Sequence, residues 1–550
     1  MAALFRPAQS RPLHAAAGGL LLAAAFPQPG LAVLAWLVPA WWLFCARGLT
    51  SRRAFAVGWA GGLTFNLAAL YWLNHIPWPV MPTLGWLVLS AYLALYPALW
   101  LALCAAECET RNAESPAPDA IASCSQGVLP NDASWPARAL WCLRCAVLWV
   151  ALEMLMARLL TGFPWLLLAN SQHEQLPLIQ LASLTGTAGV SFLIVWSSAS
   201  LLGSVQVLAR SRGRPWAGLG EVSLPMLALA GVLAFGLARL LQPAPAGKEI
   251  TFALIQPSIP QTVKWDQDAS QRAFARVLEL SRAALALKPD VLVWPEAATP
   301  GLLRYNEALH NEVTGLAREH KVWLLLGADD ALARADDPNQ ADYFNSAFLI
   351  SPEGKVTGKY DKQRLVIFGE YIPLTRWLPF LKWFTPVESG FKPGDAPVQF
   401  TLDGLGVRLA PLICFEDVFA FHTRGFIEPD TGLLVNLTNN GWFGESAAQW
   451  QHAAMSVYRA VETGRPMVRC TNNGLTCWVD ARGRMHEVYF GDSDDIYGAG
   501  FKIARLRVTG LGETPPPTFY QRHGDWFGWL CVGLAGGQIL FRTLTKWRKR

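Results

Sequence analysis

Three short segments of the chain place a chemically reactive residue at the end of a predicted strand. Glu296 follows Val-Leu-Val-Trp-Pro, Lys362 follows Tyr-Asp, and Cys414 follows Pro-Leu-Ile. In α/β folds the ends of strands are where reactive side chains usually become accessible. Acyl transfer needs these residue types: a thiol that can ionise, a carboxylate that takes its proton, and a cation where negative charge appears on the carbonyl oxygen. The segments therefore indicate nucleophilic acyl chemistry.

Each of these residues also has an ordinary structural interpretation. Cys414 in an apolar strand can be a buried inert thiol, Glu296 after Trp-Pro can be a carboxylate at a helix start, and Lys362 can be a solvated surface charge. Taken singly, such residues are more often structural than catalytic. A purely structural interpretation would require three coincidences in one chain, so the joint pattern favours catalysis.

Short apolar runs and amphipathic stretches alternate around these residues and predict the elements that position them. The runs predict strands at Ile250 to Ile255, Val291 to Trp294, Val322 to Leu326, Ala347 to Ile350, Val407 to Ile413 and Leu433 to Leu437. Two stretches between them, Gln271 to Leu287 and Asn306 to His320, have apolar residues at helical spacing. This alternation predicts a layered α/β domain with buried sheet.

The remainder of the chain is too apolar for a soluble protein. The sequence is 52% hydrophobic and 16% charged, and it holds 25 tryptophans, which favour membrane interfaces. Runs long enough to cross about 30 Å of hydrocarbon predict eight transmembrane helices. They lie near residues 12–27, 31–46, 54–74, 84–106, 139–160, 180–209, 222–242 and 525–543. The first run could instead be a cleaved signal peptide, but it reads with the second as a helical hairpin.

The distribution of basic residues predicts how these helices are oriented. Basic residues follow the second and sixth spans and end the chain, at Arg47, Arg52, Arg53, Arg210, Arg212, Arg214 and Lys546-Trp-Arg-Lys-Arg550. Cytoplasmic loops carry such an excess, so both termini are expected inside and the α/β domain on the periplasmic side of a bacterial inner membrane. The predicted domains are 1–247 with seven helices, 248–513, and 514–550 with the last helix and a basic tail. The net charge of +5 is too small and too scattered to indicate nucleic acid.

Glu153 lies inside the fifth predicted span, where a carboxylate costs about 2.5 to 3.5 kcal/mol and marks a functional site by default. Arg158 is a poor partner for it within the same helix, because residues five apart do not face each other. Arg158 can reach the membrane interface instead, and Glu153 can find a donor on another helix. The structural and the functional interpretation of Glu153 are equally open.

The ten cysteines are spread over the whole chain and do not indicate a disulfide scaffold. Cys104/Cys108 and Cys142/Cys145 have ligand-like spacing but no histidine nearby, so we expect membrane core and no metal site. Cys470 and Cys477 could face each other across the turn between them and oxidise. Neither is expected to be required for activity.

The order Glu, Lys, Cys with these neighbours resembles the nitrilase superfamily over residues 250–510. Within it, the chain is similar to the apolipoprotein N-acyltransferases, which combine an N-terminal bundle, a periplasmic nitrilase-like domain and a last helix. The stretches that carry this likeness are Gly162-Phe-Pro-Trp165, Gln256-Pro-Ser-Ile-Pro, Asn439-Asn-Gly-Trp442-Phe-Gly444, Trp450-Gln-His452 and Thr471-Asn-Asn-Gly474. The resemblance implies an α-helical membrane bundle of eight helices that carries an α/β domain of the αββα sandwich type. It is weakest in the loop 107–137.

The resemblance also implies roles for the residues around the thiol. Cys414 would form a thioester and Glu296 would act as general base. Lys362 and the backbone N–H of Phe415 would stabilise the oxyanion. Some members of the family carry tyrosine where this chain has Phe415, so a role for that hydroxyl is not expected here.

Four further residues are assigned supporting roles by the resemblance. Glu370 and Glu416 match additional family glutamates, which would orient the lysine and the thiol, and carboxylates near a lysine hold it charged. Trp265 and Trp442 would line the entrance for the acyl chain, although core packing is almost as compatible with buried indole rings.

The implied reaction moves an acyl chain from a phospholipid to Cys414 and then to the α-amine of an S-diacylglyceryl cysteine at a lipoprotein N-terminus. Both substrates belong to the bilayer, which explains why the catalytic domain is tied to membrane helices. No metal or cofactor is needed, and we expect a monomer.

Two other functions compete with this interpretation. A membrane-tethered amidase could hydrolyse a small amide with the same three residues, but it would need a polar, water-fed pocket. Against it, the segment from Phe368 to Phe384 is rich in large apolar side chains and is suited to act as a mobile lid at the lipid surface. A non-enzymatic scaffold or transporter is disfavoured by the intact catalytic set.

Overall fold

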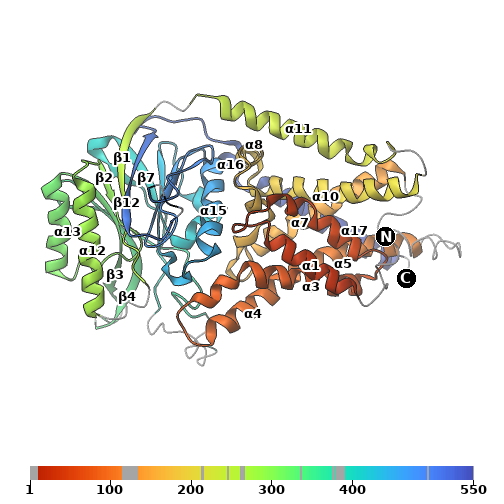
Figure 1. Ribbon diagram of the computed structural model, residues 1–550, viewed down its shortest axis with the longest axis horizontal. Coiled ribbons are helices and arrows are strands. Elements are labelled where there is room, and N and C mark those ends of the chain that lie inside the picture. The colour runs from red at the N-terminus through yellow and green to blue at the C-terminus, as the bar shows by residue number, and fades with distance from the viewer. Residues whose placement is uncertain are drawn as a thin grey trace. The chain divides into compact units, whose positions relative to one another are not determined.

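The computed structural model describes residues 10–113, 134–211, 216–243, 247–260, 267–334, 337, 339–373, 377, 390–491, 493 and 495–548. Contacts divide the chain into two units (Figure 1). A helical unit comprises Met1–Asn74, Thr83–Leu241 and His523–Arg550, and a sheet unit comprises His75–Pro82 and Gln242–Arg522.

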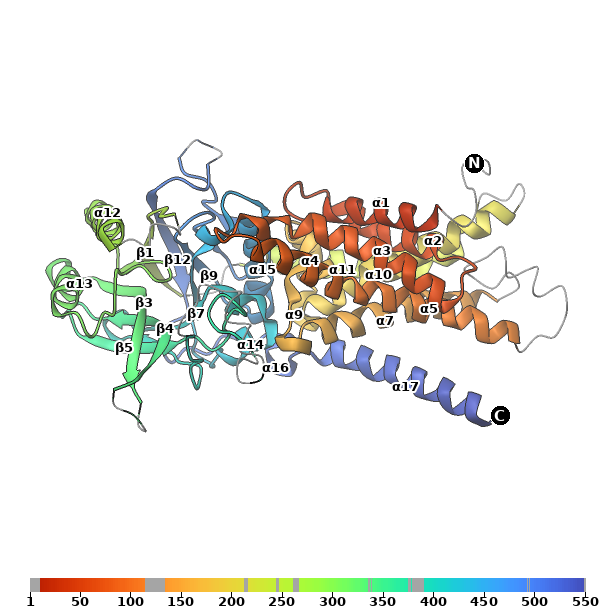
Figure 2. The same ribbon diagram turned by 90° about the horizontal axis from the view of Figure 1, so that it is seen from below.

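The helical unit is built from long apolar helices that lie alongside one another (Figure 2). Its main elements are α1 (Arg11–Ala23), η2 (Ala32–Trp36), α2 (Val38–Cys45), α3 (Ser51–Ala69), α4 (Met81–Leu93), α5 (Leu95–Ala113), α7 (Trp135–Met156), α10 (Thr187–Arg210), α11 (Leu219–Leu241) and α17 (Trp526–Arg548). Small residues allow close approach of the backbones. A Cβ added at Gly19 of α1, for example, would lie 2.2 Å from the Gly61 carbonyl oxygen of α3.

Helices occupy all eight regions where spans were predicted, and five of them are long and apolar enough to cross a membrane. These five, among the residues described above, are Met81–Ala106, Trp135–Met156, Thr187–Arg210, Leu219–Leu241 and Trp526–Thr545. The regions at the chain start are shorter or less apolar, since α1 has 13 residues. A membrane region is therefore supported, and the number eight stays a prediction.

Two predicted spans end differently from expectation. The fifth was predicted to reach residue 160, but α7 stops at Met156 because the following chain adopts left-handed backbone, with φ 51° at Leu160 and 84° at Gly162. A Cβ at Gly162 would lie 2.1 Å from the Ala157 carbonyl oxygen, so only glycine fits that turn. The sixth was predicted from residue 180, but the long helix begins at Thr187, after Gly186 with φ 66°.

The contacts of Glu153 fit the structural interpretation. Its carboxylate accepts hydrogen bonds from Trp149 Nε1 at 2.9 Å and from the backbone N–H of Leu168 at 2.8 Å. Leu168 begins the short turn η6 (Leu168–Gln172), where the backbone lacks α-helical bonds of its own. Backbone groups in an apolar region need a partner inside the protein, and Glu153 supplies one. Arg158 pairs instead with Asp525.

The sheet unit contains two six-stranded mixed sheets (Figure 1). The first has the order β12-β1-β2-β3-β4-β5, formed by Gly500–Val508, Lys248–Gln256, Val291–Val293, Trp323–Ala333, Ala341–Ile350 and Val356–Asp361. The second has the order β11-β10-β9-β8-β7-β6, formed by Met485–His486, Cys477–Val479, Met467–Thr471, Leu433–Thr438, Val407–Ile413 and Phe400–Leu402. The first strand of the unit, β1, and its last strand, β12, form one antiparallel pair, with Lys248 opposite Val508.

The two sheets pack face to face and helices cover their outer faces. β1 contacts β9 and β4 contacts β7 across the interior. The helices α12 (Gln267–Leu285) and α13 (Glu307–His320) cover the first sheet, and their apolar faces join its core. The helix α15 (Ala447–Thr463) covers the second sheet together with the short α14 (Ala420–Gly425). The predicted αββα sandwich is confirmed in its layers.

The sheet register rules out the possibility that Cys470 and Cys477 face each other. Cys477 of β10 lies opposite Arg469 of β9, so Cys470, the next residue, points to the other face of the sheet. The Cys470 thiol contacts the carbonyl oxygens of Ile255 and Val293, each at 3.3 Å, in the interior between the sheets. Both cysteines are free and buried.

This register predicts that oxidation does not link the two cysteines. Purified protein treated with diamide should give no Cys470–Cys477 peptide under non-reducing mass spectrometry, because joining them would require one strand to turn over. A linked peptide recovered from folded protein would contradict the register. The same experiment on denatured protein, where the thiols are free to meet, serves as the control.

Candidate active site

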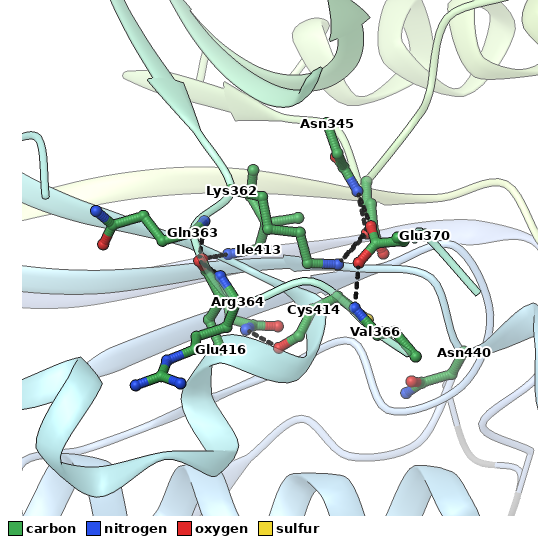
Figure 3. A network of polar contacts seen from close by, with 12 residues as sticks. Asn345, Lys362, Gln363, Arg364, Val366, Glu370, Ile413, Cys414, Glu416 and Asn440 are labelled. Atoms are coloured by element: carbon green, nitrogen blue, oxygen red, sulfur yellow. Dashed lines mark hydrogen bonds and ion pairs between the residues drawn. The ribbon is translucent and has the colours of Figure 1, made fainter. Parts of the chain in front are cut away.

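The ammonium group of Lys362 is buried between two carboxylates at the end of β5. Its Nζ lies 2.9 Å from Glu370 Oε1 and 3.2 Å from Glu296 Oε1, and the lysine is 1% exposed (Figure 3). Burial lowers the pKa of Lys362, but Glu296 and Glu370 outweigh burial and hold that pKa well above its usual value. The lysine therefore remains a cation inside the protein.

Asn345 on β4 was not predicted, and it connects the three charged residues. Its Nδ2 donates to Glu296 Oε1 at 2.7 Å and to Glu370 Oε1 at 2.8 Å, and its backbone carbonyl oxygen accepts the backbone N–H of Lys362 at 2.9 Å. Glu370 Oε2 accepts the Val366 N–H at 2.8 Å. One polar residue among the several of β4 gives no sequence signal for this role, because the role depends on partners far away in the chain.

Cys414 begins the turn η10 (Cys414–Val418) immediately after β7, with a left-handed φ of 52°. Such backbone is costly for a residue other than glycine, by about 1–3 kcal/mol, and persists only where the surrounding structure holds it. Asn436 of β8 holds the turn by donating to the Cys414 carbonyl oxygen at 2.9 Å. Burial raises the pKa of the Cys414 thiol to about 12, with a further contribution from Glu296, while Lys362 acts in the opposite direction. The resting thiol is neutral and needs a base.

Glu416 holds the backbone around the nucleophile rather than contacting the lysine. Its Oε2 accepts the N–H of Ile413 at 2.8 Å. Its Oε1 accepts the N–H groups of Gln363 and Arg364 at 2.8 and 3.1 Å, and also the Tyr360 hydroxyl at 2.6 Å. Burial would raise the pKa of Glu416, but its donors, which include His422, outweigh burial and lower that pKa. One carboxylate thus joins the segment after Lys362 to the strand that ends at Cys414.

A second buried network, also not predicted, lies beneath the nucleophile turn. Asp417 Oδ1 lies 2.7 Å from His452 Nε2, and its Oδ2 accepts from Ser456 at 2.5 Å and from Arg469 at 2.7 Å. His452 Nδ1 lies 3.2 Å from Asn440 Oδ1. The available sequence signals were the adjacent acids at 416 and 417 and the Trp450-Gln-His452 stretch. The network fixes the turn against α15 and against the loop that follows β8.

Two of the remaining predicted residues, Phe415 and Trp442, lie in the turns that follow β7 and β8 of the second sheet. Phe415 follows the nucleophile, and its ring packs edge-on against Phe419 with centroids 5.0 Å apart. Trp442 lies in the short turn η11 (Asn440–Phe443) after β8, the strand next to β7. Trp265 lies outside the described residues, as does most of the predicted lid between Phe368 and Phe384. Within the described ranges, no group of three or more His, Cys, Asp or Glu side chains is placed to hold a metal.

The geometry predicts that Glu416→Gln destabilises the sheet unit. Both oxygens of this carboxylate accept backbone N–H groups, which can only donate, so a glutamine amide would direct its NH₂ group at an N–H and leave buried groups unpaired. We expect a loss of about 2–4 kcal/mol, measured as a lower midpoint of unfolding of the detergent-solubilised protein. Glu428→Gln is the matched control, because Glu428 pairs with Arg408 at the surface. Equal midpoints for both variants would refute the role given to Glu416.

Comparison with known proteins places this fold and site in a family. Residues 18–200 match the model of the apolipoprotein N-acyltransferase N-terminal domain, and residues 251–493 match the carbon–nitrogen hydrolase model. An apolipoprotein N-acyltransferase of Geobacter metallireducens is 36% identical, over 96% of this chain and 94% of its own length. One from Nitrosomonas europaea is 33% identical, over 92% of this chain and 91% of its own length. Among solved structures, an amidase from Nesterenkonia sp. is 17% identical over 48% of this chain and 93% of its own, with a TM-score of 0.35.

The sheet unit is thus a nitrilase-like catalytic unit, as the Glu, Lys and Cys segments predicted. Since the likeness to the named relatives extends over nearly the whole length of both chains, the chain belongs to the apolipoprotein N-acyltransferase family. It is accordingly an acyltransferase, and the amidase alternative is the less supported one.

Proposed function

We propose that the chain transfers an acyl group from a phospholipid, through a thioester on Cys414, to the α-amine of the S-diacylglyceryl cysteine of an apolipoprotein. The observation that carries the proposal is the buried ammonium of Lys362 between Glu296 and Glu370, in the sheet unit that also carries a strained cysteine. A neutral thiol, a carboxylate and a fixed cation are the groups that acyl transfer to sulfur requires.

In the first half-reaction Glu296 takes the thiol proton as Cys414 Sγ attacks the donor ester carbonyl. The C=O electron pair moves onto oxygen, where Lys362 and the Phe415 backbone N–H stabilise it. Collapse of the tetrahedral intermediate breaks the C–O bond. The proton on Glu296 then passes to the leaving oxygen, and a lysophospholipid departs with the acyl group left on sulfur.

In the second half-reaction the α-amine attacks the thioester carbonyl and gives a proton to Glu296. The C–S bond breaks, the amide forms, and the proton returns to sulfur, which restores the neutral thiol. The raised pKa of the Cys414 thiol favours completion of the cycle, because a protonated sulfur does not attack the newly formed amide. Glu370, with Asn345, positions the ammonium throughout, and Trp442 lines the entrance for the acyl chain.

We also propose that the helical unit spans the bacterial inner membrane eight times, with both termini in the cytoplasm and the catalytic unit in the periplasm. The domains are 1–247, 248–513 and 514–550, and the protein acts as a monomer. The five long apolar helices and the basic residues near Arg53, Arg210 and the C-terminus support this arrangement.

Topology can be tested by accessibility labelling of single cysteines. A cysteine introduced at position 545, near the end of α17, should react with a membrane-impermeant maleimide only after the inner membrane is broken, and one at position 353 should react in intact spheroplasts. Glu353 lies on a turn of the sheet unit, so both sites avoid the core. Labelling of position 545 in intact spheroplasts would overturn the proposed orientation.

The catalytic proposal predicts a covalent intermediate. Protein mixed with phospholipid alone should carry a hydroxylamine-sensitive acyl adduct on Cys414, visible by mass spectrometry, and added diacylated lipopeptide should discharge it as an amide. Cys414→Ala should form none, and Glu296→Gln should lose acylation. Lys362→Ala should be slower by about 10²- to 10³-fold, as expected when an oxyanion-stabilising group is removed.

The same assay separates transfer from hydrolysis. A transferase must exclude water and hold the thioester until the amine arrives, whereas an amidase-like enzyme would release fatty acid steadily. Cys531→Ser, which changes a free thiol of the helical unit, is the control that should leave the adduct unchanged. Absence of an adduct, or its discharge to water as fast as to lipopeptide, would show that the proposed function is wrong.

A further inference from the structure

Arg364, two residues after Lys362, places its guanidinium group against two aromatic rings. Its guanidinium carbon lies 5.2 Å from the centroid of the Phe419 ring and 4.9 Å from that of Phe421. The side chain is half-buried, and it makes no hydrogen bond or ion pair with any residue in the part of the chain that the structure describes.

Contact of this kind holds a guanidinium beside the rings without using its hydrogen-bond donors. An aromatic ring attracts the cation through its face, and this attraction uses none of the five N–H donors of the guanidinium. Two parallel N–H groups match two oxygens of a phosphate, and a pre-oriented guanidinium loses little freedom when it binds. The contacts of Arg364 therefore prepare it for an oxyanion ligand.

Arg364 is closely tied to the nucleophile turn. Its backbone N–H and that of Ile413, the residue before Cys414, are both bound by the carboxylate of Glu416, at 3.1 and 2.8 Å. Phe419, one of its two aromatic contacts, follows the turn that starts at Cys414, and its ring also packs against Phe415. In Figure 3 the guanidinium of Arg364 extends away from Lys362 and Glu370, so it is not a second cationic partner of the Glu370 carboxylate.

The charges around the catalytic lysine give a reason for a further cation at this site. Lys362 is surrounded by Glu296 and Glu370, and Glu416 lies beside the same segment. This part of the site therefore holds three carboxylates and one lysine. A phospholipid brings a further negative charge, its phosphodiester, within a glycerol unit of the ester that reacts. Without a compensating cation the approach of such a donor would be electrostatically unfavourable.

We propose that Arg364 binds the phosphodiester group of the phospholipid donor and so sets which ester reaches Cys414. The inference rests on the proposed function and deepens it, because it assigns the anionic part of the donor to a residue outside the Glu, Lys and Cys set. The chemistry recognised is a phosphate monoanion, and the source to which we commit it is the lipid.

The test compares two acyl donors in the adduct assay. Phospholipid carries the phosphate, and p-nitrophenyl octanoate delivers an acyl group without one. Arg364→Met keeps the apolar stem against Phe419 and removes the charge. We expect it to slow acylation of Cys414 by subsaturating phospholipid about 10- to 100-fold, mainly by raising the half-saturating donor concentration, with no change for the ester.

Three further measurements make the comparison decisive. Arg364→Lys should recover part of the phospholipid rate, because it restores the charge without the fork of two donors. Discharge of a preformed thioester by lipopeptide should be the same in all variants. Arg276→Met is the matched control, since Arg276 pairs with Glu279 on the exposed face of α12, and it should behave as wild type with both donors.

Equal losses with both donors would mean that Arg364 only packs against the aromatic rings, and the inference would be wrong. It would also be wrong if Arg364→Met used both donors at wild-type rates while inorganic phosphate raised the unfolding temperature of the wild-type protein and not that of the variant. Arg364 would then bind a free anion and not the lipid. Failure of the wild-type protein to form an adduct with either donor would instead contradict the proposed function.

Discussion

A buried lysine ammonium is the interaction on which the rest of this site depends. Removing a charge of this size from water costs several kcal/mol unless partners replace the lost hydration. Here Glu296 and Glu370 supply opposite charge, and one amide of Asn345 bridges them, so two like-charged carboxylates are held on one cation. Because these partners come from segments after β2, on β4 and after β5, the arrangement depends on the part of the first sheet from β2 to β5.

The second sheet contributes the sulfur, and its geometry is held from two sides. Glu416 gathers backbone N–H groups from the segment after Lys362 and from the end of β7. Asp417, the next residue, is held in the opposite direction by His452 and Arg469. Two adjacent acids thus anchor a strained turn to different layers of the sandwich, so the cost of the left-handed backbone at Cys414 is offset by contacts outside the turn.

The sequence allowed the layers and the reactive residues to be predicted because both follow local patterns. The apolar runs at 250–255, 291–294 and 407–413 appear as β1, β2 and β7, since a buried strand needs an uninterrupted apolar run. β9 was missed because its Arg469 is a poor candidate for a core strand until Asp417 is known to meet it. Helix α15 was missed for the same reason, as it buries Gln449, His452 and Arg459, which look like surface residues. Asn345 is the clearest case, since its function is defined entirely by residues distant in the chain.

The antiparallel pairing of β1 with β12 has a consequence for how such proteins arise. Because Lys248 lies opposite Val508, the first and last strands of the sheet unit are neighbours, while all the proposed catalytic residues lie on the path between them. A domain with adjacent ends can be inserted into a connection of another protein without stretching or breaking either partner. A single recombination event between genes would therefore be enough to add a complete nitrilase-like enzyme to a helical membrane protein, with its sheets and its nucleophile already assembled.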